Sequence, residues 1–166
     1  MADAVEAVLE QWRRECPDLD VAPIGVVGRI MRLSRLWDKA IKDFLGEHDL
    51  EPGEFDILST LRRSGDPYEL TAGAFLRASL VTTGAITLRV DRMIAKDLVT
   101  RVPDPADRRS VKIRLTPRGL ETIDRVLPLH LANESRLLDG LAPDERRRLA
   151  AVLSTLLESN GDTPAR

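Results

Sequence analysis

Two adjacent arginines, Arg108 and Arg109, end a run of turn-forming residues that begins at Pro103. Apolar and basic residues alternate from Val111 to Leu115, which predicts a β-strand, and Leu98–Val102 would be its antiparallel partner. Guanidinium groups at the exposed tip of such a hairpin suit DNA phosphates and the narrow minor groove better than a protein core. We therefore predict a hairpin that contacts DNA.

The segment before this hairpin predicts a short amphipathic helix. It begins at Thr82 or Thr83, after a tight turn at residues 79–81, and ends near Asp97. An α-helix fits the major groove of DNA, and a thin hairpin can reach the minor groove. The two elements together could contact both grooves at once.

The distribution of charge favours the same interpretation. Residues 77–118 contain ten Lys and Arg against four Asp and Glu, whereas residues 1–76 contain nine against fifteen. The whole chain has a net charge of −2, which argues against a nonspecific polycation. A solvated basic surface would show the same charges. Aromatic residues make up only 4% of the chain, so duplex DNA is favoured over single strands, which need stacking surfaces.

Several other classes of protein are disfavoured by composition. No apolar run is long enough to span a membrane, and no signal peptide is visible at the N-terminus. A single cysteine, Cys16, excludes an intrachain disulfide framework, so a cytoplasmic protein is expected. His48 and His130 are too few for a metal cluster, and no nucleotide-binding loop or nucleophile motif occurs. We expect no cofactor, no metal and no enzymatic activity.

The rest of the chain reads as helices separated by turns. The expected helices are 3–15, 24–48, 52–63, 72–78, the helix described above, one from Thr116–Pro117 that is kinked near Pro128, and 143–158, with a tiny strand at 68–70. Two short helices, a brief turn between them and a following hairpin indicate a winged helix-turn-helix. The predicted fold is mainly α with a small β-wing.

Long apolar helices flank this DNA-binding segment on both sides. The helix at 24–48 has a wider apolar face than one small domain needs. We therefore divide the chain into residues 1–50 and 117–166, which form N- and C-terminal dimerisation helices, and residues 51–116, which form the winged helix. A two-fold homodimer would set the spacing of its two recognition helices on a pseudo-palindromic operator.

The motif Asp104-Pro105-Ala106-Asp107-Arg108-Arg109-Ser110, followed by Leu115-Thr116-Pro117-Arg118-Gly119, resembles the MarR family of transcriptional regulators over nearly the whole chain. The resemblance implies that Thr82, Thr83 and Thr87 contact phosphates or bases. It also implies that Arg109 enters the minor groove and that Asp107 orients it. We include Arg92 and Arg108 among the expected DNA contacts. The chain departs from the family at Leu88, where a polar residue is common; Leu88 could contact a thymine methyl group.

A narrower resemblance concerns the urate-responsive (PecS-like) subgroup. An extra N-terminal helix with a tryptophan, the triplet Glu54-Phe55-Asp56 and two arginines carry it. The positions that match its urate-binding residues are Trp12, Asp56, Arg89 and Arg101. The resemblance implies that urate, a planar anion, binds these side chains and releases the protein from DNA.

Helical periodicity gives separate reasons to notice two of these residues. Arg89 falls at the edge of the buried face of its helix, where a charge needs a partner. Asp56 lies on the side of its helix away from Leu58 and Leu61. Spacing alone also fits simpler roles: packing for Trp12, ion pairs for Asp56 and Arg89, and a phosphate contact for Arg101.

Three other functions remain open at this point. The first is a MarR-type regulator that responds to phenolics or antibiotics. The second is a ligand-independent DNA-binding protein. The third is a winged-helix module that binds proteins, which the basic hairpin tip and the recognition-helix hydroxyls disfavour. Cys16 is also a minor candidate for oxidant sensing.

Overall fold

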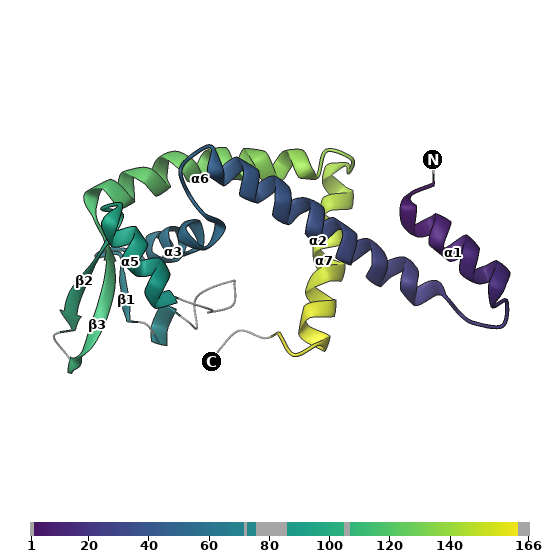
Figure 1. Cartoon of the computed structure of the whole chain (residues 1–166), viewed down its shortest axis with the longest axis horizontal. Coiled ribbons are helices and arrows are strands. Elements are labelled where there is room, and N and C mark those ends of the chain that lie inside the picture. Colours follow the sequence, from purple (N-terminus) through teal and green to yellow (C-terminus); the bar gives the residue numbers. More distant parts are fainter. Residues whose placement is uncertain (1, 72, 76–85, 105–106, 163–166) are drawn as a thin grey trace. The chain divides into compact units, whose positions relative to one another are not determined.

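The computed structural model describes residues 2–71, 73–75, 86–104 and 107–162. For residues 107–110 it describes the backbone and not the side chains. The chain divides into two compact units, Met1–Asp43 and Phe44–Arg166. The elements are α1 (Ala4–Glu15), α2 (Ala22–Gly46), α3 (Pro52–Arg63), β1 (Glu69–Thr71), α5 (Ile86–Ala95), β2 (Val99–Asp104), β3 (Asp107–Leu115), α6 (Pro117–Leu137) and α7 (Pro143–Ser159) (Figure 1). Residues 73–75 are also helical.

Most predicted elements lie within a few residues of their observed positions. The tiny strand is β1, and the hairpin strands β2 and β3 are longer than the alternation predicted. Helix α6 continues through Pro128 from Pro117 to Leu137. The start of the recognition helix, at Thr82 or Thr83, lies outside the described residues, and so does most of the predicted helix at 72–78. None of the described helices is both long and apolar enough to cross a membrane.

In the N-terminal unit, α1 packs closely along α2. The buried side chains between them are those of Val5, Leu9 and Val21. Close packing is possible because α2 has glycines at positions 25 and 28. A Cβ atom on Gly28 would lie 3.3 Å from a Val5 methyl group, and one on Gly25 would lie 3.4 Å from a Leu9 methyl group.

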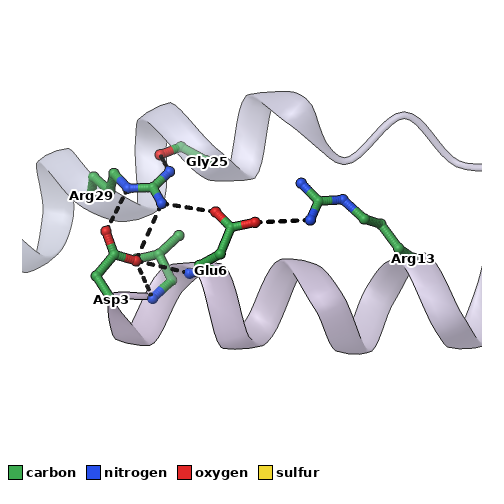
Figure 2. Close-up of polar contacts among 6 residues, drawn as sticks. Asp3, Glu6, Arg13, Gly25 and Arg29 are labelled. Atoms are coloured by element: carbon green, nitrogen blue, oxygen red, sulfur yellow. Dashed lines mark hydrogen bonds and ion pairs between the residues drawn. The ribbon is translucent and has the colours of Figure 1, made fainter. Parts of the chain in front are cut away.

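An ion-pair network fastens α1 to α2 (Figure 2). Arg29 Nε donates to Asp3 Oδ2 at 2.7 Å, and Arg29 Nη2 donates to Glu6 Oε2 at 3.1 Å. Asp3 is also the N-cap of α1, because its side chain accepts hydrogen bonds from the amides of Val5 and Glu6. The Arg29 guanidinium lowers the pKa of Asp3. The pKa of Glu6 is lowered chiefly by Arg13 and also by Arg29.

The second unit is built on a small antiparallel sheet with β3 in the centre, in the order β1-β3-β2. Leu70 pairs with Ile113, and Arg101 pairs with Ile113 from the other side. Helices α3, α5 and α6 pack around the base of this sheet. The core there consists of fully buried side chains, including Ile57, Leu58, Leu61, Val90, Met93, Val99, Ile123 and Val126.

The start of α6 is joined tightly to the base of the hairpin. The Thr116 hydroxyl donates to the Asp97 carbonyl at 2.6 Å and accepts the Gly119 amide at 2.9 Å, so it caps α6. Pro117 follows at the first helical position, where no amide proton is needed. Gly119 lies against the Leu98 carbonyl, and any Cβ there would collide with that oxygen. Steric and capping requirements therefore account for the Thr-Pro-x-Gly sequence.

Candidate DNA interface and effector site

Helix α5 is amphipathic in the way that a recognition helix requires. Val90 and Met93 are buried against the domain, whereas Thr87, Leu88 and Arg92 are exposed. The helix runs into the β2–β3 hairpin, so the two predicted DNA-contacting elements are consecutive and adjacent (Figure 1). A helix and a hairpin so placed can occupy neighbouring grooves of a duplex.

The residues expected at the tip of the hairpin lie at the start of β3. Backbone pairing joins Asp104 to Asp107, with an irregularity in the register at Pro103 and Asp104. Asp107, Arg108 and Arg109 are part of this strand, and their side-chain contacts lie outside the described residues. Thr82 and Thr83 also lie outside them.

Not all the positive charge of the hairpin is available to DNA. Lys112 Nζ lies 3.2 Å from Glu69 and 3.4 Å from Asp104, and Arg114 Nε donates to Glu69 at 2.6 Å. Arg114 lowers the pKa of Glu69, and Glu69 in turn raises the pKa of Lys112. The base of the hairpin is therefore an internally paired cluster, which a count of charges along the sequence does not reveal.

Arg89 extends from α5 across to the first turn of α3. Its guanidinium occupies the space beside Gly53, where a Cβ atom would collide with it. Arg89 forms no ion pair with any other residue that the structure describes. Together with Arg92 it lines a cavity of about 310 Å³, whose opposite wall is the segment Glu51–Glu54.

Arg101 has a partner that the sequence did not suggest. Its Nη1 lies 2.8 Å from Asp91 Oδ1 on α5. Asp91 and Arg89 are two residues apart, which places them about 160° apart around the helix. In this structure Arg101 and Arg89 thus lie on different flanks of α5.

The two other predicted effector residues occupy different surroundings. Asp56 is half-buried on α3, one turn beyond Gly53 and on the same side of that helix. Asp56 takes part in a polar or electrostatic interaction. Trp12 belongs to the N-terminal unit, where its side chain on α1 is 43% exposed. Among the described residues, no group of His, Cys, Asp and Glu is arranged to bind a metal ion.

Sequence reasoning missed one buried pair beside the cavity. Glu54 is only 2% exposed, and its Oε2 accepts a hydrogen bond from Lys96 Nζ at 3.0 Å and one from the Glu51 amide at 3.0 Å. The acidic residue three positions after Glu51 could have indicated this helix start. The lysine comes from another element, 42 residues away, so nothing local points to it.

Comparisons with known proteins agree on one family. Residues 48–110 match the sequence model described as the MarR family. The chain is 39% identical over 149 residues to the HTH-type transcriptional regulator PecS of Dickeya dadantii, covering 90% of each protein. It is 32% identical over 134 residues to the regulator YkoM of Bacillus subtilis, covering 76% of this chain and 85% of the relative.

Solved structures show the same fold. The MarR family regulator AbsC of Streptomyces coelicolor superposes with a TM-score of 0.77 at 24% identity, covering 87% of this chain and 98% of AbsC. BpsR of Bordetella bronchiseptica, whose DNA binding is regulated by 6-hydroxynicotinic acid, gives a TM-score of 0.71 at 23% identity over 79% of this chain and 91% of BpsR.

Proposed function

Because the chain belongs to the MarR family of DNA-binding transcriptional regulators, we propose that it is a homodimeric repressor that urate releases from its operator. Members of this family act by binding DNA and not by catalysis. DNA binding and transcriptional regulation follow from the family. We further propose that the protein forms a homodimer, that it binds a pseudo-palindromic operator and that its ligand is urate.

The arrangement of α5 and the hairpin supports the DNA contacts. In the proposal helix α5 enters the major groove with Thr87, Leu88 and Arg92 facing the bases. Thr82 and Thr83, which lie outside the described residues, supply further hydroxyls. The tip residues Asp107, Arg108 and Arg109 enter the minor groove, where the negative potential attracts guanidinium groups.

Exposed apolar side chains support the dimer. Helix α7 has no fully buried residue in the single chain, yet it carries exposed apolar side chains at Val152, Leu156 and Leu157. On α2, Val26, Val27 and Leu36 are likewise exposed. A monomer rarely leaves such surfaces in water, so burial against a second copy is the expected outcome.

The observation that carries the ligand proposal is the position of Arg89. It has no ion-pair partner among the described residues, it lines a cavity, and it projects from the recognition helix. A guanidinium suits the oxygens of a planar anion such as urate. In the proposal Arg89 and Arg101 supply the cations that bind the ligand, and Asp56 supplies the carboxylate. Trp12 is the residue that the family resemblance assigns to the face of the ligand.

The release mechanism follows from these positions. In the free protein Asp56 favours the resting position of Arg89 electrostatically. A bound anion repels Asp56 and attracts Arg89, and because Arg89 is fixed to α5, the recognition helix shifts. Two half-sites lie about one helical turn apart, so a small shift in both subunits weakens DNA binding. Coupling of this kind typically amounts to about 1–3 kcal/mol.

The test is calorimetric titration of urate into the purified protein, with xanthine and salicylate as comparison ligands. The operator is first identified by selection from randomised duplexes, and urate is then titrated into the complex. We expect saturable binding near one urate per subunit and loss of the DNA complex over the same concentration range. Preference for salicylate over urate would instead support a regulator of phenolic compounds, and DNA binding insensitive to all three would contradict the ligand proposal.

A further inference from the structure

The paired cluster at the base of the hairpin takes a charged side chain from each of the three strands. Its members are Glu69 of β1, Asp104 of β2, and Lys112 and Arg114 of β3. We propose that Lys112, by joining Glu69 to Asp104, sets the direction of the hairpin tip and so positions the tip arginines for DNA. The inference rests on the proposed entry of the tip into the minor groove, and it does not depend on the identity of the ligand.

The paired cluster lies on the face of the sheet that points away from the core. Ile113 and Leu115 of β3 are buried, so the alternate residues Lys112 and Arg114 lie on the opposite face. Glu69 is the ladder partner of Arg114 and therefore shares that face. From the central strand, the ammonium group of Lys112 reaches a carboxylate on each neighbouring strand, at 3.2 Å on β1 and 3.4 Å on β2.

Lys112 lies where the sheet narrows from three strands to two. Strand β1 ends at Thr71, which is the ladder partner of Lys112. Towards the tip, the ladder that the structure describes joins β2 and β3 alone. A two-stranded ribbon is marginally stable on its own and twists more than a wider sheet does. The direction of the tip therefore depends on the contacts that hold the base of the ribbon.

Asp104 lies on the tip side of this point, where the ribbon is least regular. The register shifts between Pro103 and Asp104, and Asp104 is paired with Asp107 across the hairpin. Such an irregularity bends a strand and increases its local twist. The Asp104 carboxylate is also buried, and a buried charge requires partners. It has a further polar or electrostatic interaction besides the Lys112 pair, so Lys112 restrains Asp104 without being its sole partner.

The proposal predicts an effect of opposite sign to that of simple charge attraction. Removing a carboxylate makes the hairpin more positive and releases cations towards the phosphates, which by itself strengthens DNA binding. If the paired cluster positions the tip, the same change weakens binding. Glu69 is the suitable carboxylate to change, because it lies on β1 and not on the hairpin itself.

The first experiment measures binding of Glu69→Gln to the operator selected from randomised duplexes, by fluorescence anisotropy at several salt concentrations. Binding should weaken by about threefold to thirtyfold, and the slope of log affinity against log salt should stay at the wild-type value. Asp124→Asn is the matched control. It also removes a carboxylate paired with an arginine, since Asp124 accepts a hydrogen bond from Arg62 at 2.6 Å, but that pair joins α3 to α6. Its operator affinity should not fall.

The second experiment changes the cation. Lys112→Met keeps the length of the side chain and loses the charge, and should weaken operator binding by a similar factor. The salt slope should again stay at the wild-type value, because no phosphate contact is lost. Lys112→Arg keeps a cation that can reach both carboxylates and should restore most of the affinity. Circular dichroism at the assay temperature gives the folded fraction, and affinities are calculated per folded protein.

Each outcome supports or overturns the positioning role. Tighter binding by Glu69→Gln, or a salt slope reduced by about one in Lys112→Met, would overturn it and make the cations direct phosphate contacts. Equal losses in Glu69→Gln and Asp124→Asn would overturn it in favour of a general loss of stability. Wild-type binding by Glu69→Gln and Lys112→Met would also overturn it, while a loss in Arg109→Ala would keep the tip in the minor groove. Wild-type binding by Arg109→Ala would contradict that part of the proposed function.

Discussion

At the scale of single residues, the most consequential group is the buried carboxylate of Glu54. Its side chain is almost completely buried and is held by the ammonium group of Lys96 and the Glu51 amide. A buried charge is tolerated only when its hydrogen-bond partners remain in place. This pair also ties α3 to the end of α5, so it fixes one wall of the cavity relative to the other.

Lys96→Ala should therefore lower the free energy of unfolding by about 2 kcal/mol, because it leaves the Glu54 carboxylate without its cation. The measurement is denaturant-induced unfolding followed by circular dichroism. Lys39→Ala is the control: Lys39 pairs with Asp43 on the surface of α2, and its loss should change stability by less than about 0.5 kcal/mol. Equal effects of the two variants would contradict the role given to Lys96.

The network of Asp3, Glu6 and Arg29 predicts a dependence on pH. Both carboxyl groups have pKa values lowered in the folded state, so the stability they contribute is fully present above their ordinary values. It is lost as pH falls through the lowered pKa values, in the range below about pH 4. Arg29 stays charged throughout. The packing of α1 against α2 should therefore weaken in this pH range. The measurement is Trp12 fluorescence in a Trp37→Phe background. Arg29→Ala should remove the transition that is attributed to the network.

At the scale of elements, helices were easier to predict than contacts between them. Apolar periodicity and the prolines at helix starts placed α1, α3 and α7 within a residue or two. The pairs Arg101–Asp91 and Lys96–Glu54 join different elements, so their partners depend on tertiary packing and leave no local pattern. A count of charges over residues 77–118 likewise does not reveal which cations are paired: Glu69 on β1 pairs with Lys112 and Arg114 of β3.

The junction of the hairpin with α6 predicts an effect of Gly119→Ala. The added methyl group would collide with the Leu98 carbonyl, and because that atom belongs to the backbone, the strand or the helix must move. We expect a loss of about 1–3 kcal/mol in unfolding free energy, measured from denaturant midpoints. Gly140→Ala, where a Cβ meets nothing within 4 Å, should not lose stability in this way.

The hairpin tip predicts a separable effect on DNA binding. Arg109→Ala should weaken operator binding and reduce the slope of log affinity against log salt by about one, because one phosphate-neutralising contact is lost. Urate affinity should stay at the wild-type value. Fluorescence anisotropy at several salt concentrations gives both quantities. An unchanged salt slope with unchanged DNA affinity would exclude Arg109 from the interface.

At the scale of the whole molecule, the chain exposes apolar surface that a second copy would cover. The clearest case is α7, none of whose residues is fully buried in the single chain. Val152→Asp places a charge in its apolar stripe and should shift the protein to monomers, with a parallel loss of operator affinity. Sedimentation equilibrium measures the shift. Arg147→Asp lies on a different side of α7 and should remain dimeric; monomers from both variants would indicate general damage to the helix.

The contacts of Thr116 and Gly119 with the base of the hairpin affect how fast backbone amide hydrogens exchange with deuterated solvent. The Leu98 amide donates to the Met93 carbonyl, the Thr116 amide to the Leu98 carbonyl, and the Gly119 amide to the Thr116 hydroxyl. The end of α5, the start of the hairpin and the first turn of α6 are thus linked by one chain of hydrogen bonds. These amides should open together, as one cooperative unit with a single protection factor.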